Sequence, residues 1–211
     1  MGLYLNPRND SFQQAINNPI YVDKSLLINY TNQLIGTGDN KLCVSRPRRF
    51  GKSTDANMLV AYYSKGCDSQ YIFDSLKISQ TDHYLKHLNK HHVIHINIQS
   101  FLSNTHNIDK MIQLLTARIL NEFKQEYSIT FFDETNLSLS LEDIYASTKN
   151  QFIFIIDEWD CIFREYKQDK EAQKQYLDFL RNLLKDKPYV ELAYMTGILP
   201  IKKYGTHSAL N

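Results

Sequence analysis

The stretch Ser45-Arg-Pro-Arg-Arg-Phe-Gly-Lys-Ser-Thr54 is the most informative part of this 211-residue sequence. A short apolar run, Lys41 to Ser45, precedes it, and the pattern from Lys52 to about Tyr63 is that of a helix ending at Gly66. A loop between a strand and a helix can bind an anion, because its backbone N–H groups and the positive end of the helix dipole converge there. This context predicts a phosphate-binding loop.

The residue types in this loop suit the phosphates of a nucleotide. Gly51 lets the backbone approach a phosphate closely. Lys52 is expected to reach the β- and γ-phosphates, the hydroxyl of Ser53 to ligate Mg²⁺, and Thr54 to face the α-phosphate. We expect the nucleotide to contact seven consecutive residues: Arg48, Arg49, Phe50, Gly51, Lys52, Ser53 and Thr54.

Two positions depart from the general phosphate-loop pattern G-x-x-x-x-G-K-[ST]. Arg46 stands where that pattern has its first glycine, and Pro47 removes one backbone N–H from the loop. Two roles stay open for Arg46, Arg48 and Arg49. They either stabilise the negative charge of a transition state, or they bind phosphate and nearby acids without taking part in the reaction. A basic surface turn at a helix start is the alternative to a phosphate loop, but it does not explain a second set of residues far along the chain.

That second set follows an apolar strand. The run Phe152–Ile156 is continuously apolar, as a strand covered on both faces must be, and it delivers Asp157 and Glu158 at its carboxyl end. Open α/β sheets bind ligands at this edge. We expect Asp157 to hold Mg²⁺ through water opposite Ser53, and Glu158 to polarise the attacking water as a general base. Thr196, at the end of another apolar strand, is expected to contact the γ-phosphate or orient that water.

The order of elements predicts an α/β fold. Strands that alternate with helices imply right-handed crossovers, a mainly parallel sheet and helices on both faces, which is the three-layer sandwich of a P-loop NTPase. The expected strands are 41–45, 93–98, 152–156 and 189–195, and the expected helices are 27–34 after an N-cap at Asp23, 52–63, 108–119, 141–149 and 171–185, with a loop over 129–140.

Two domain-level expectations follow from this order. Residues 1–40 form a helical prelude, and residues 41–211 form the P-loop ATPase core. Such a sheet normally has about five strands. Four are recognised here and the last residues, Thr206–Asn211, add no further strand or helix, so we expect a core that is incomplete at its C-terminus.

The composition argues against several classes of protein. The 24 Lys+Arg residues nearly balance the 23 Asp+Glu residues, which gives no support to nucleic-acid binding, although a local basic patch stays open. Cys43, Cys67 and Cys161 are too widely spaced for a disulfide framework or a paired metal site. No signal peptide and no apolar run of about 20 residues is recognised. We expect a soluble, cytoplasmic protein with no membrane partner.

Four stretches together resemble the bacterial AAA-ATPase-like family. They are Tyr21-Val-Asp-Lys24, Ser45–Thr54, Ile156-Asp-Glu-Trp-Asp160 and Thr196-Gly-Ile-Leu199. The resemblance extends from Tyr4-Leu-Asn-Pro7 to Ser208-Ala-Leu-Asn211, and it accounts for Arg46, since this family normally lacks the first loop glycine.

The resemblance implies specific roles for the matching residues. Gly51, Lys52 and Ser53 would bind phosphates and metal, while Asp157 and Glu158 would carry hydrolysis. The choice of ATP over GTP rests on the resemblance alone. Family members usually carry a C-terminal module like a restriction-endonuclease nuclease, which this sequence does not contain.

Three functions stay open at this point. The leading one is Mg²⁺-dependent ATP hydrolysis coupled to conformational change in a larger protein, with Lys52, Glu158 and Thr196 as catalytic residues. The second is a nucleotide-binding switch with negligible turnover. The third is a nucleic-acid-associated module of a defence or mobile-element protein. The oligomeric state is open, and Tyr21 either stacks on the base or packs in the apolar core.

Overall fold

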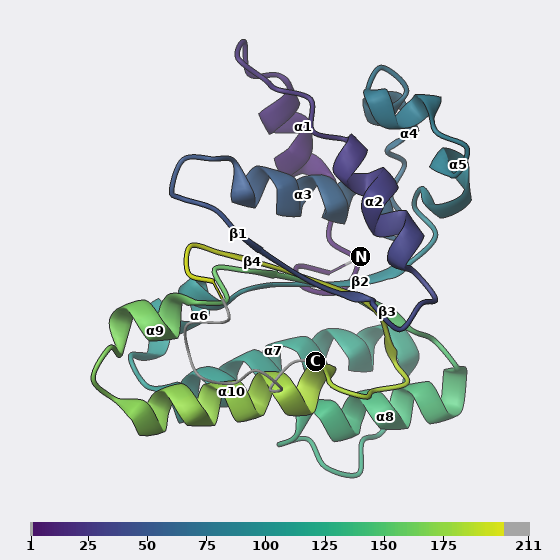
Figure 1. The fold of residues 1–211 in the computed structure, drawn as a ribbon. Coiled ribbons are helices and arrows are strands. Elements are labelled where there is room, and N and C mark those ends of the chain that lie inside the picture. The colour runs from purple at the N-terminus through teal and green to yellow at the C-terminus, as the bar shows by residue number, and fades with distance from the viewer. Residues whose placement is uncertain (1, 201–211) are drawn as a thin grey trace.

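The computed structural model describes residues 2–200, which fold around one four-stranded sheet with helices on both faces (Figure 1). The strands run parallel, as the sequence predicts, and their order in the sheet is β1-β4-β3-β2. Their bounds are β1 Lys41–Ser45, β2 His92–Asn97, β3 Phe152–Asp157 and β4 Val190–Gly197. The predicted α/β sandwich of the P-loop NTPase type is confirmed. The predicted tail Thr206–Asn211 lies outside the described residues.

Helices cover both faces of the sheet and complete the three layers (Figure 1). One face carries α1 Asp10–Ile16, α2 Leu26–Leu34, α3 Lys52–Tyr63, α4 Gln70–Phe73, the 3₁₀ helix η1 Lys77–Gln80 and α5 Tyr84–His87. The other carries α7 Ile108–Tyr127, α8 Leu137–Thr148 and α10 Lys170–Leu184. Two short helices, α6 Ile98–Thr105 and α9 Cys161–Glu165, directly follow β2 and β3 at the carboxyl edge.

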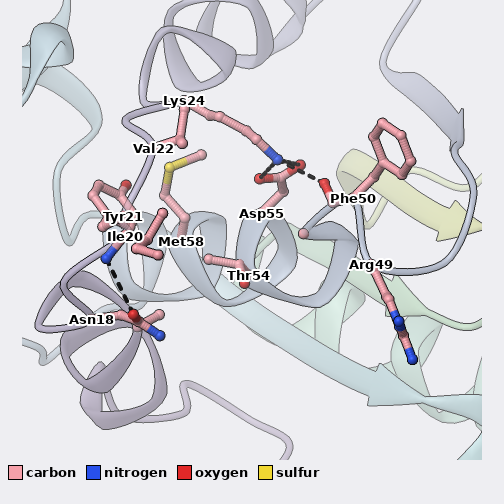
Figure 2. A pocket seen from close by; sticks show the side chains of 12 residues that line it. Asn18, Ile20, Tyr21, Val22, Lys24, Arg49, Phe50, Thr54, Asp55 and Met58 are labelled. Atoms are coloured by element: carbon pink, nitrogen blue, oxygen red, sulfur yellow. Dashed lines mark hydrogen bonds and ion pairs between the residues drawn. The ribbon is translucent and has the colours of Figure 1, made fainter.

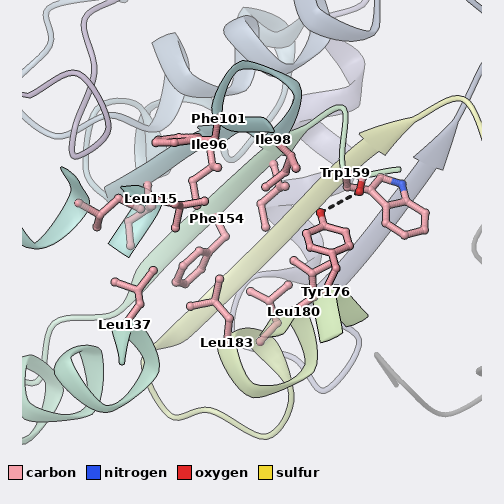
Figure 3. Packing of buried hydrophobic residues seen from close by; sticks show 14 of the residues in the cluster. Ile96, Ile98, Phe101, Leu115, Leu137, Phe154, Trp159, Tyr176, Leu180 and Leu183 are labelled. Carbon is pink, nitrogen blue, oxygen red and sulfur yellow. Dashed lines mark hydrogen bonds between the residues drawn. The ribbon is translucent and has the colours of Figure 1, made fainter. Parts of the chain in front are cut away.

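Strand β3 separates two buried clusters, because successive side chains of a strand point to opposite faces. Ile153 and Ile155 pack with α3 and the N-terminal helices. Phe154 and Ile156 pack with α7 and α10 on the other face, where Figure 3 shows Phe154 among Leu115, Leu137 and Leu183. The strand is buried along its whole length, which fixes the acid at its end.

The N-terminal segment covers the outer edge of β2. Leu5 forms an antiparallel bridge with Ile94, and the carboxylate of Glu122 on α7 accepts hydrogen bonds from the backbone N–H groups of Leu3, Tyr4 and Leu5 at 2.7–2.9 Å. An uncovered edge strand exposes unpaired backbone groups, so this cover protects the sheet. No sequence pattern predicted it.

The prediction of Asp23 as an N-cap is wrong. Helix α2 begins after Ser25, and its N-cap makes no side-chain hydrogen bond to the helix. Instead, Asp23 accepts hydrogen bonds from the N–H of Ser25 at 2.8 Å and from the N–H of Lys77 at 2.9 Å. The carboxylate therefore joins the start of α2 to η1, and these bonds lower its pKa against the opposing effect of burial.

Two predicted boundaries near asparagines are also wrong. Helix α8 begins at Leu137 rather than Leu141, because Asn136 caps it by accepting from the N–H groups of Ser138 and Leu139. Similarly, β2 ends at Asn97, which caps α6, so the predicted strand residue Ile98 opens a helix. Asparagine is a favoured N-cap residue, and this signal was available in the sequence.

Candidate nucleotide site at the carboxyl edge of the sheet

The loop between β1 and α3 has a backbone shaped for close approach. The N–H of Arg46 donates to the carbonyl of Gly197 at 3.0 Å, which ties the start of the loop to the end of β4. Arg49 and Gly51 both have left-handed backbones, with φ of 69° and 77°. Gly51 is the N-cap of α3, and Lys52 opens that helix as predicted. The loop therefore turns sharply into a helix N-terminus, where anions are favoured.

Lys24 braces this loop from the side. Its Nζ donates to the carbonyl of Phe50 at 2.8 Å and pairs with Asp55 on α3 at 3.3 Å (Figure 2). The positive φ of Gly51 favours glycine, and a Cβ there would lie 2.8 Å from the same Nζ, so the Lys24 side chain would have to shift. Burial raises the pKa of Asp55, and the Lys24 charge acts against that rise. In the sequence, Lys24 was recognised only as the last residue of the stretch Tyr21–Lys24. No sequence pattern indicated that Asp55 would pair with it.

Lys52 is almost fully buried at the base of the loop. Its side chain is 6% exposed, and its Nζ donates to the carbonyl of Pro47 at 3.2 Å. The amine therefore lies inside the curve of its own loop.

The metal-binding candidates Ser53, in the first turn of α3, and Asp157, at the end of β3, lie within hydrogen-bonding reach of each other. Asp157 is 3% exposed, and its carboxylate accepts from the N–H of Glu158 at 2.9 Å. Burial raises the pKa of Asp157, while the Ser53 hydroxyl, the Glu158 backbone and the Lys52 charge act to lower it. This carboxylate thus has a cation and a hydroxyl beside it in a largely water-free setting.

Glu158 has an unexpected partner. Its carboxylate forms an ion pair with the guanidinium of Arg164 on α9, and its backbone is left-handed with φ of 54°. Both side chains are mostly buried, at 23% and 15% exposed. The sequence analysis did not single out Arg164, because its relation to Glu158 depends on how the chain turns after β3.

Thr196 lies next to Asp157 in the register of the sheet. Its residue is fully buried, and its hydroxyl has no hydrogen-bond partner among residues 2–200. The carbonyl of Thr196 accepts from the N–H of Trp159 at 3.2 Å. Unlike the loop residues, Thr196 is not among those that line the cavity described next.

Two cavities flank the loop. The larger, of about 720 Å³, lies over the strand ends and is lined by Arg48, Arg49, Gly51, Lys52, Ser53, Thr54, Asn97, Glu158 and Arg164, among others. The smaller, of about 400 Å³, lies on the other side of the loop and is lined by Asn18, Ile20, Tyr21, Lys24, Phe50, Asp55 and Met58, among others (Figure 2). Arg49, Gly51 and Thr54 line both.

The residues present fit a magnesium ion only together with a ligand. Within residues 2–200, no group of three His, Cys, Asp or Glu side chains could hold a metal by itself. Ser53 and Asp157 offer oxygen donors, which Mg²⁺ prefers, and Mg²⁺ commonly takes its remaining ligands from phosphates and water. The chemistry of the donor pair therefore matches a metal that arrives with a nucleotide.

A parallel sheet, a loop entering a helix N-terminus and an acid at a neighbouring strand end define a domain of the P-loop NTPase type. Residues 9–206 match the family described as "AAA-ATPase_like: Predicted AAA-ATPase", and the chain belongs to this family. Membership supports nucleotide binding in general. Neither a curated protein nor a solved structure matches the chain. Within the described residues, every helix is too short or too polar to cross a membrane.

Proposed function

We propose that this domain binds ATP with Mg²⁺ and hydrolyses it. The observation that carries the proposal is the pair of cavities that meet at Arg49, Gly51 and Thr54. The larger cavity has cationic side chains and a helix N-terminus for phosphates, whereas the smaller has apolar and aromatic walls for a base. One extended ligand with an anionic end and a flat apolar end matches both.

The base would lie against Tyr21 in the smaller cavity. The Tyr21 ring packs edge-on against Phe12 with centroids 6.1 Å apart, and it also lines the smaller cavity, where we propose that it contacts the base. Burial and then the Asp23 charge raise the pKa of Tyr21 to about 12, so the phenol stays neutral at physiological pH. Met58 on the facing helix supplies a polarisable contact. The choice of adenine over guanine rests on the family.

In this proposal different polar residues bind the phosphates, hold the metal and activate the water. Lys52 and the loop from Arg48 to Thr54 bind the phosphates, and Ser53 and Asp157 hold Mg²⁺, which would neutralise phosphate charge when bound. Glu158 accepts a hydrogen bond from the attacking water and polarises it. Thr196, buried beside Asp157, orients groups at the strand end.

A nucleotide-binding switch with negligible turnover is the second candidate, and the Glu158–Arg164 ion pair favours it. A carboxylate oxygen that already accepts from a guanidinium is less available to accept a hydrogen bond from the attacking water. If the pair persists with nucleotide bound, the domain would hold ATP without hydrolysing it.

The test measures ATP affinity and phosphate release on the same preparations. We expect Lys52→Ala to weaken ATP binding by roughly 100-fold, since it removes a charge-assisted contact to phosphate. Glu158→Gln should retain binding and lose turnover by about 100-fold or more. Binding without phosphate release in both wild type and Glu158→Gln would establish the switch, and unchanged affinity in Lys52→Ala would contradict the site.

The wider setting is also a proposal. We infer that hydrolysis drives conformational change in a larger protein, in which a nuclease-like module or a nucleic acid is the acted-on partner. We also propose the division into a helical prelude, residues 1–40, and a core, residues 41–211; in support of a close association between them, Phe12 and Ile28 pack in the same buried cluster as α3. The three cysteines are free thiols, which fits the reducing cytoplasm.

A further inference from the structure

Arg164 is a cationic residue of the larger cavity that does not belong to the phosphate-loop motif. It lies on α9, directly after the acidic strand end, and lines the same cavity as Lys52 and Ser53. Within residues 2–200 its guanidinium makes one hydrogen bond, to the carboxylate of Glu158. Its Nε lies 3.6 Å from Asp160 and makes no hydrogen bond there.

One oxygen of the Asp160 carboxylate, Oδ2, is already engaged elsewhere. It accepts hydrogen bonds from the backbone N–H groups of Ile198 and Leu199 at 2.9 and 2.8 Å, which hold the segment after β4. Asp160 thus serves Arg164 as a nearby negative charge rather than as a matched partner. An arginine fork can bind two oxygens at once, and here Glu158 takes only one of its N–H groups.

We propose that Arg164 is a catalytic residue that contacts the γ-phosphate of a nucleotide bound to its own chain. When a nucleoside triphosphate binds, Arg164 leaves Glu158 and pairs with this phosphate. The inference rests on the proposed function. A terminal phosphate carries more charge than a carboxylate and offers three oxygens to the fork, so it competes well for the guanidinium. Arg164 needs only to turn within the cavity that it already lines.

When Arg164 exchanges its carboxylate partner for the γ-phosphate, both Arg164 and Glu158 become available for catalysis. Arg164 places positive charge where the transition state accumulates negative charge, and Glu158 is left free to accept a proton from water. In the reaction, the water oxygen forms a bond to the γ-phosphorus as the bond to the bridging oxygen breaks. That oxygen leaves with its electron pair on the diphosphate, and the water proton passes to Glu158. A diphosphate has no γ-phosphate and therefore leaves the ion pair intact.

The primary test compares the affinities of ATP and ADP in wild type and Arg164→Ala. Loss of a charge-assisted contact should weaken ATP binding by about 10- to 100-fold and leave ADP binding nearly unchanged. Turnover should fall by about 1000-fold. The control is Arg181→Ala on α10, which removes an arginine from an exposed ion pair with Asp178. This variant should change neither the ATP affinity nor the ADP affinity. An unchanged ATP-to-ADP preference in Arg164→Ala would overturn the proposal.

A second comparison separates direct contact from support of Glu158. In a Glu158→Gln background the ion pair is gone, so an arginine that acts only through Glu158 would have no further effect on ATP affinity. We expect Arg164→Ala to weaken ATP binding in that background by a larger factor than in wild type, because no ion pair has to be broken there. Glu158→Gln alone should tighten ATP binding, because the competitor for the guanidinium is removed.

Three further outcomes each have a defined meaning. If Arg164→Ala does not fold, Arg164→Lys in the Glu158→Gln background replaces it, since lysine keeps the charge but lacks the fork; we expect a partial loss of ATP preference, and no loss would refute the contact. If wild type binds neither nucleotide, and Lys52→Ala behaves the same, the proposed function itself has failed. If wild type binds ATP and the preference ignores Arg164, only this inference has failed.

Discussion

The two edges of the sheet treat their buried polar groups differently. At the carboxyl edge, polar atoms of Trp159, Asp160, Arg164 and Thr196 are buried without a hydrogen-bond partner within residues 2–200. These four are among six such atoms in the described part of the chain. Buried polar groups are usually paired, so this concentration of exceptions sets the carboxyl edge apart. Of the four residues, Arg164 lines the larger cavity, where a ligand could supply its missing contact.

The amino edge satisfies most of its groups from within the protein. Asn89 donates to the carbonyls of Ala61, Tyr62 and Ser64, and His91 bridges His87 and Glu191 at 3.0 and 2.8 Å. These bonds join the ends of α3, α5 and β4 into a fixed base. We infer that the amino edge of the sheet stabilises the fold, whereas the carboxyl edge retains polar groups that can bind a ligand. The following predictions test this difference.

The largest effect is expected at Asp157 on the carboxyl edge. Asp157→Asn should lower Mg²⁺-dependent turnover by roughly 100-fold, as loss of a metal-orienting carboxylate does. Because burial raises the pKa of Asp157, its carboxylate is protonated more readily than an exposed one, so Mg²⁺ binding should weaken on acidification. A magnesium titration across pH measures this. Asp178→Asn on α10 is the control, and an equal effect there would contradict the assignment.

The next effect concerns acid stability at the amino edge. Burial, followed by the His91 and Lys86 charges, lowers the pKa of His87 to about 4 from 6.5. Between these values the unfolded chain binds a proton that the folded chain does not, so stability is fully present above pH 6.5 and falls as the pH drops toward 4. The free energy of unfolding should lose at most about 3 kcal/mol by this route.

Denaturant melts at several pH values measure that loss. The variant His87→Asn should flatten the decline between pH 6.5 and 4, while ATP affinity at neutral pH stays as in wild type. A variant with the same slope as wild type would show that His87 does not titrate as described.

A smaller effect is expected from the loop glycine. Gly51→Ala introduces a Cβ at φ of 77° and within 2.8 Å of Lys24 Nζ, and should cost about 1–2 kcal/mol of unfolding free energy. Two glycines provide matched controls. Gly36 has the same φ with nothing nearby, so Gly36→Ala isolates backbone strain, and Gly38→Ala introduces neither problem. ATP affinity should fall only in Gly51→Ala, and a loss in Gly36→Ala would indicate a global effect.

The smallest effect is expected where the N-terminal segment covers β2. Glu122→Gln keeps one acceptor oxygen but loses the charge that receives three backbone N–H groups, and should cost about 1 kcal/mol. Hydrogen exchange should rise at Leu3, Tyr4 and Leu5 and stay unchanged in β3. Uniform exchange across the sheet would mean that this cover is part of the cooperative core.

Local patterns explain what the sequence predicted. The four strands are apolar runs, and the loop around Lys52 has its glycine, lysine and serine side by side, so each signal lies within ten residues. Asp157 was predictable because a buried strand ends in a carboxylate. These features depend on burial and on neighbours along the chain.

The rest depends on contacts that no local pattern encodes. Lys24 reaches a carbonyl 26 positions away, and Glu122 binds backbone more than 100 positions away. Helices α4, α5 and α9 have four or five residues, which is too short for a periodic apolar stripe. Arg164 was missed for both reasons, since it lies on α9 and its ion pair with Glu158 depends on how the chain turns after β3.

The most direct test of the central claim is the structure of this chain with Mg²⁺ and a non-hydrolysable ATP analogue. The account predicts the triphosphate on the loop from Arg48 to Thr54, the base in the cavity beside Tyr21, and the Lys52 amine moved from the Pro47 carbonyl to phosphate oxygen. An analogue bound elsewhere, or a Lys52 that still donates to Pro47 with the analogue present, would contradict it.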